Sequence, residues 1–165
     1  MRWFIDKKFE KSEGIGWIKA FVNKYETDRL EWVRFDPDKA KLVGQCLPPA
    51  GDIQYRIACK IPNAYPREAV AHLSPIYQSD DGSWPREVIP AEIMRNEKTG
   101  VQWVRQFGKL AILDQDEAII WAFTRGAFRW LKGTSQIFGK LNEIEADSFA
   151  TEKIKMFKKE MGISV

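Results

Sequence analysis

The sequence predicts an α+β domain, with an antiparallel sheet of about five to seven strands packed on two C-terminal helices. Aromatic and β-branched residues between turn signals dominate the first two thirds of the chain, and two capped helical patterns fill the last third. No internal repeat, low-complexity linker or break in composition divides the 165 residues. We therefore expect a single domain over 1–165, with mainly strands and loops over 1–113 and a helix pair over 114–165.

The segment 14–61 is expected to form consecutive antiparallel strands, because aromatic and β-branched residues are typical of sheets. One apolar run covers 17–25 and a second covers 30–35. Turn-forming residues follow at 36–38 and 48–52. Two further strands are expected after the second run, over 41–47 and 53–61.

The middle segment, 62–100, is expected to hold short strands and long loops. It contains five prolines and a turn-forming run at 79–83. Strands are predicted here and just beyond, over 69–77, 88–94, 101–107 and 109–113.

Two helices follow. The first is predicted to begin after Asp114, a good N-cap with Glu117 three residues on, and to end at Gly133. Its interior is apolar on nearly every side, so it should be buried. The second is predicted to begin near Asn142, again with a glutamate three residues on, and to run to about Glu160 with one apolar stripe.

Two arginines share a narrow face of the buried helix. Arg125 and Arg129 are one turn apart. Burying an unpaired guanidinium costs several kcal/mol, so this face should meet carboxylates or water. Glu143 and Asp147 are also one turn apart on the second helix, at the edge of its apolar stripe, and are the expected partners.

The residues 121–131 and 142–150 resemble the paired helices of the zincin (gluzincin-type) metallopeptidases. In that family the first helix carries His-Glu-x-x-His and the second carries Glu-x-x-Ala-Asp. Glu143-Ile-Glu-Ala-Asp147 matches the second motif. The resemblance implies that Glu143 stands where the third zinc ligand would be and Asp147 where a residue orienting a ligand would be. It also implies a sheet that packs on the helix pair and includes a substrate-binding edge strand.

The first motif is not matched. Its His, Glu and His fall on Arg125, Gly126 and Arg129. Arginine keeps its proton near neutral pH and cannot bind a cation, and glycine has no side chain to act as a base. The one histidine, His72, lies far upstream in an expected strand. We therefore expect neither a metal nor another cofactor, and no peptidase activity.

Two interpretations of Arg125, Arg129, Glu143 and Asp147 remain open. The arginines can replace the metal and brace the helices, or they can stay partly free and bind a carboxylate or phosphate. The leading hypothesis is thus a non-catalytic binding or regulatory module whose partner is a protein or an anionic ligand at the degenerate cleft. The alternatives are a nucleic-acid-binding module that uses Lys and Trp surfaces, and an enzyme with a non-metal site in residues 62–100, where acidic residues occur at Asp80, Asp81, Glu87 and Glu92.

Charge and hydropathy bear on the partner and on the cell compartment. The formal charge is +3, with 26 basic residues interspersed among 23 acidic ones, which gives weak support to nucleic acid as a partner. The densest basic stretch is expected to be a solvated helix face and comprises Lys153, Lys155, Lys158 and Lys159.

No apolar run reaches the roughly 18 residues that span a bilayer, and no signal peptide is evident, so a cytoplasmic protein is expected. Cys46 and Cys59 are then free thiols, unless export or a thermophilic origin favours a disulfide.

Overall fold

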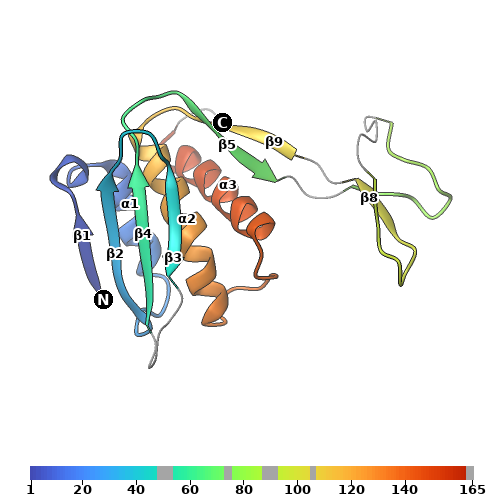
Figure 1. Cartoon of the computed structure of the whole chain (residues 1–165), viewed down its shortest axis with the longest axis horizontal. Coiled ribbons are helices and arrows are strands. Elements are labelled where there is room, and N and C mark those ends of the chain that lie inside the picture. The colour runs from blue at the N-terminus through green and yellow to red at the C-terminus, as the bar shows by residue number, and fades with distance from the viewer. Residues whose placement is uncertain (48–53, 73–75, 87–92, 105–106, 163–165) are drawn as a thin grey trace.

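Three helices and nine strands in three small sheets form the described part of the chain in this computed structural model (Figure 1). The described residues are 1–47, 54–72, 76–86, 93–104 and 107–162. The strands are β1 (Arg2–Ile5), β2 (Leu30–Pro37), β3 (Val43–Leu47), β4 (Tyr55–Ile61), β5 (Arg67–His72), β6 (Ile76–Tyr77), β7 (Ile93–Arg95), β8 (Gln102–Val104) and β9 (Phe107–Ile112). The helices are α1 (Glu13–Val22), α2 (Gln115–Gly133) and α3 (Glu143–Glu160), with a short 3-10 turn, η1 (Lys7–Phe9). The predicted α+β class is confirmed.

The largest sheet has four strands in the order β1-β2-β4-β3. β1 pairs with β2 and β2 pairs with β4 in parallel, whereas β3 pairs with β4 antiparallel and forms one edge. The prediction of one antiparallel sheet of about five to seven strands is therefore wrong here, because this sheet is mixed and has four strands. A helical crossover between β1 and β2 returns the chain to the same end of the sheet, which makes this pair parallel. β4 is parallel to β2 because the intervening strand β3 runs in the opposite direction and lies at the edge, beyond β4.

That crossover is α1, which occupies most of the segment 17–25 where a strand was predicted. The side chain of Ser12 caps the helix by accepting a hydrogen bond from the N–H of Gly14 at 3.1 Å. Buried Ile15, Ile18 and Val22 then recur at helical spacing. The residue types favoured a sheet, but the spacing of the apolar positions and the cap specify a helix.

The two C-terminal helices are confirmed, including their caps. The carboxylate of Asp114 accepts a hydrogen bond from the N–H of Glu117 at 2.9 Å, and the amide oxygen of Asn142 accepts one from the N–H of Glu145 at 2.8 Å. α2 is the central helix and contacts β3, β4, α1 and α3. Its apolar residues are buried on nearly all sides, as predicted. None of the described helices is long and apolar enough to cross a membrane.

Two of the four lysines on α3 are not part of a solvated face, so that prediction is half wrong. The ammonium of Lys158 lies 3.1 Å from the carboxylate of Glu117, and these side chains are only 12% and 3% exposed. The ammonium of Lys153 lies over the ring of Phe149, 4.9 Å from the ring centroid. Lys155 and Lys159 are exposed, as expected.

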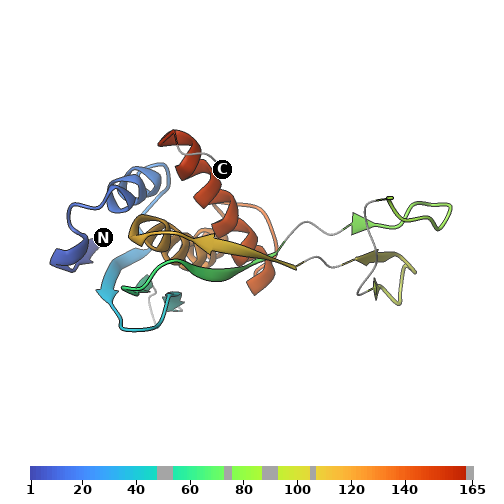
Figure 2. The ribbon, with the colours of Figure 1, turned by 90° about the horizontal axis from the view of Figure 1, so that it is seen from above.

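The middle of the chain forms two small antiparallel sheets. β5 pairs with β9, and β6, β8 and β7 form a three-stranded sheet in that order. The strand predicted over 69–77 is thus two strands in different sheets, and most of the strand predicted over 88–94 lies outside the described residues. In both ribbon views the three-stranded sheet stands apart from the helices (Figure 2).

Candidate functional site

A pocket of about 580 Å³ lies between the edge strand β3 and the two C-terminal helices. β3 contributes Gly44 and Cys46, α2 contributes Arg129, and the first residue of α3 contributes Glu143. A smaller hollow of about 320 Å³ also borders β3 and α2, near Trp121 and Asp147. We call the two hollows together the cleft.

Two glycines allow β3 to pack directly on α2. A Cβ atom at Gly44 would lie 1.7 Å from the backbone oxygen of Ala122, so no larger residue fits without moving the strand or the helix. A Cβ atom at Gly126 would lie 3.1 Å from a methyl group of Ile57 and 3.3 Å from the backbone nitrogen of Gln45. The position that the resemblance assigns to a glutamate base therefore faces packed sheet, with little room for a side chain.

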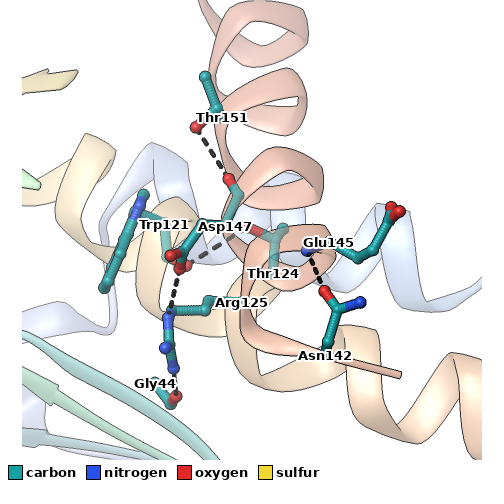
Figure 3. A network of polar contacts seen from close by, with 8 residues as sticks. All are labelled: Gly44, Trp121, Thr124, Arg125, Asn142, Glu145, Asp147 and Thr151. Carbon is teal, nitrogen blue, oxygen red and sulfur yellow. Dashed lines mark hydrogen bonds and ion pairs between the residues drawn. The ribbon is translucent and has the colours of Figure 1, made fainter. Parts of the chain in front are cut away.

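Arg125 and Asp147 form an ion pair at the smaller hollow. The Nε of Arg125 donates to a carboxylate oxygen of Asp147 at 2.7 Å, and its Nη1 donates to the carbonyl of Gly44 at 3.4 Å (Figure 3). The guanidinium also lies 5.7 Å from the centroid of the Trp121 ring. The side chains of the pair are 28% and 10% exposed. This pair therefore connects α2, α3 and β3 at one point.

Arg129 and Glu143 line the larger pocket but remain exposed. Among the residues that the structure describes, no ion pair joins them. The four charged residues singled out in the sequence thus lie along one cleft, with one pair in contact and one pair open to solvent.

Cys46 lines the same pocket, but its buried thiol is not set up as a nucleophile. Burial raises its pKa to about 12, although the nearby positive charge of Arg129 acts in the opposite direction. At neutral pH the group is therefore a protonated thiol. Cys46 and Cys59 are both buried and free, so the disulfide alternative is not realised.

Other chemistry-bearing residues lie away from the cleft. His72 belongs to β5 and pairs with Phe107 of β9. Asp81 accepts hydrogen bonds from the backbone N–H and the hydroxyl of Ser83 at 2.9 and 2.6 Å, and these bonds lower its pKa. Such bonds are typical of a turn. Of the other acidic residues of the middle segment, Glu87 and Glu92 lie outside the described residues.

The described cleft residues can bind an anion or an extended backbone. Among the described residues, no group of three or more His, Cys, Asp or Glu is placed to hold a metal ion. Arg129 offers five N–H donors, and β3 is the edge of its sheet. Sequence reasoning did not single out β3 or Gly44, although a glycine inside a strand pattern often marks a close approach of two backbones.

Comparison with known proteins gives no match, because no protein-family model, curated protein or solved structure is significantly similar to the chain. The function of the cleft must therefore be inferred from its own residues and geometry.

Proposed function

We propose that the chain is a non-catalytic binding module on a zincin-like scaffold, and that its cleft binds an anionic group of a partner protein or small ligand. One observation carries the proposal. Arg129 is exposed, borders a pocket of about 580 Å³, and makes no ion pair with another described residue. A guanidinium in such a place binds carboxylates and phosphates through two parallel hydrogen bonds.

The scaffold part of the proposal is supported by the position of the edge strand. The zincin resemblance implies a sheet beside the helix pair, with a substrate-binding strand at its edge. Here β3 is an antiparallel edge strand and borders the pocket together with both helices. The carbonyl of Gly44 on this edge strand accepts a hydrogen bond from Arg125. An extended ligand segment can pair with this edge while its anionic group reaches Arg129.

The absence of zinc-dependent peptidase activity is supported by the side chains at the three motif positions. Arg125 and Arg129 cannot bind zinc, and Gly126 supplies no base. Arg125 is in addition occupied by Asp147 and Gly44. We expect metal analysis of the purified chain to find no stoichiometric zinc. A tightly bound zinc ion together with peptidase activity would overturn this part of the proposal.

The binding part is tested by nuclear magnetic resonance of the 15N-labelled chain during titration with inorganic phosphate and, separately, with acetate. Both anions should shift the amide signals of β3 and of the first turn of α3. Arg129→Ala should remove these shifts. Lys132→Ala removes a cation from the same helix outside the pocket, and should leave the shifts intact. Shifts that survive Arg129→Ala, or that are lost equally in both variants, would contradict the proposal.

A further inference from the structure

The four-stranded sheet has one face that no described helix or strand covers. α1 and α2 lie on the same side of the sheet, and α3 packs on α2 and β5 (Figures 1 and 2). Apolar side chains such as Val33, Phe35 and Ile57 point to the helices and are fully buried. The alternate residues of each strand point the other way and are exposed or half-buried. We call this second side the open face.

The open face is basic. Its charged residues on the paired strands are Arg2, Arg34, Asp36, Arg56 and Lys60, and Glu31 lies at a bulge beside them, 3.9 Å from Arg56. Four positive and two negative side chains give a net charge of +2, compared with +3 for the whole chain. The open face is therefore net positive.

Two aromatic rings lie among these basic groups. Phe4 on β1 is 38% exposed, and its ring meets that of Trp32 on β2 edge to face at 6.3 Å. The guanidinium of Arg34 lies 5.1 Å from the centroid of Phe4 and 5.0 Å from that of Trp32. The guanidinium of Arg2 lies 5.7 Å from the same Phe4 ring. Flat apolar groups and cations thus alternate across β1 and β2.

The register extends the positive charge across the sheet. Trp32 is paired with Arg2 on one side and with Arg56 on the other, and Lys60 is paired with Asp36. Adjacent strands are about 4.8 Å apart, so the basic groups form a track that crosses three strands beside the rings. A partner with regularly spaced negative charges and flat apolar groups matches this track.

We propose that the open face binds single-stranded nucleic acid. On binding, the guanidinium groups of Arg2 and Arg34 that lie over Phe4 and Trp32 turn to the phosphates, and unpaired bases take their place on the rings. Arg56 and Lys60 contact further phosphates. Only a single strand presents free base faces to a flat sheet, because the bases of a duplex are already stacked on one another. The open face lies on the opposite side of the sheet from α2, so this inference is independent of the function proposed for the cleft.

The test is fluorescence anisotropy with a labelled oligouridine of about 12 nucleotides, at salt concentrations from about 50 to about 200 mM. Phe4→Ala should weaken binding by about tenfold, because it removes a stacking surface. Arg34→Gln should weaken binding and lower the slope of log affinity against log salt by about 0.7, the value expected for one phosphate contact to a single strand. The matching duplex should bind more weakly than the single strand.

Two controls separate base stacking from attraction to any polyanion. The double variant Lys155→Gln and Lys159→Gln removes two exposed charges from α3 and should leave oligonucleotide affinity within about twofold of wild type. A heparin fragment has negative charge but no bases, and should bind Phe4→Ala as well as it binds wild type. The proposal is overturned if the wild-type chain does not bind oligouridine at the lowest salt, or if Phe4→Ala, folded by circular dichroism, binds it unchanged.

Discussion

The two ends of the cleft contain the same type of side chain on the same helix, yet they differ in how that side chain is used. At one end Arg125 is held by Asp147 and by the carbonyl of Gly44. At the other end, one helical turn away, Arg129 is exposed beside Glu143. Neighbouring positions on one helix face therefore have different roles, one in joining three elements and one in presenting a charge to solvent.

The difference follows from where β3 meets α2. Gly44 packs against Ala122, so its carbonyl comes within reach of Arg125, and Asp147 on α3 closes the other side. Arg129 borders the wider part of the cleft, where α3 begins. The close approach of β3 to α2, and the position of Asp147 on α3, together explain why Arg125 and not Arg129 is held in place.

The largest effect on stability is expected from Gly44→Ala, which disrupts the contact between β3 and Ala122 of α2 that distinguishes the two ends of the cleft. A methyl group added to the backbone of Gly44 with standard geometry would lie only 1.7 Å from the backbone oxygen of Ala122, and the two would collide. We expect a loss of about 3 kcal/mol in the free energy of unfolding, measured by chemical denaturation. Gly16→Ala in α1 is the matched control, since nothing lies within 4 Å of the new methyl group and helix propensity improves. Equal stability of Gly44→Ala and wild type would show that β3 does not pack as described.

A smaller loss is expected from Asp147→Ala, which removes the partner of Arg125. A fully buried pair costs about 3 to 5 kcal/mol to break, but the side chain of Arg125 is 28% exposed and keeps some contact with water. We therefore expect a loss of about 2 kcal/mol, measured by urea denaturation. Glu143→Ala, at the open end, should change the same quantity by no more than about 0.5 kcal/mol. Similar losses in the two variants would remove the distinction between the two ends.

The smallest effect on stability is expected from Arg129→Ala. An exposed side chain without an ion pair among the described residues contributes little to folding, so the melting temperature should stay within about 2 °C of wild type. Lys132→Ala provides the comparison on the same helix. A marked fall for Arg129→Ala alone would mean that Arg129 braces the fold instead of serving a ligand.

Local signals were sufficient to predict the C-terminal helices. The caps at Asp114 and Asn142 act within three residues, so they could be located without tertiary information. The helix α1 could also have been found from its apolar spacing, but its aromatic and branched residues favoured a strand. No strand was predicted over 2–5 either, so the parallel pairing of β1 with β2 was also missed.

The difference between the paired Arg125 and the exposed Arg129 could not be predicted from local signals. Helical periodicity places Arg125 and Arg129 on one face, and it gives both the same expected partners. Which of them is paired depends on Gly44, which is 81 residues from Arg125 in the sequence. Contacts of this kind are set by the packing of the strand on the helix and leave no local pattern.

The central claim is that Arg125 stabilises the fold whereas Arg129 binds an anion, and unfolding measured with and without inorganic phosphate tests it most directly. At a phosphate concentration ten times the dissociation constant, the wild-type free energy of unfolding should rise by about 1.4 kcal/mol. Asp147→Ala should be less stable than wild type but keep at least this increase, while Arg129→Ala should keep wild-type stability and lose the increase. An increase that persists in Arg129→Ala would contradict the account.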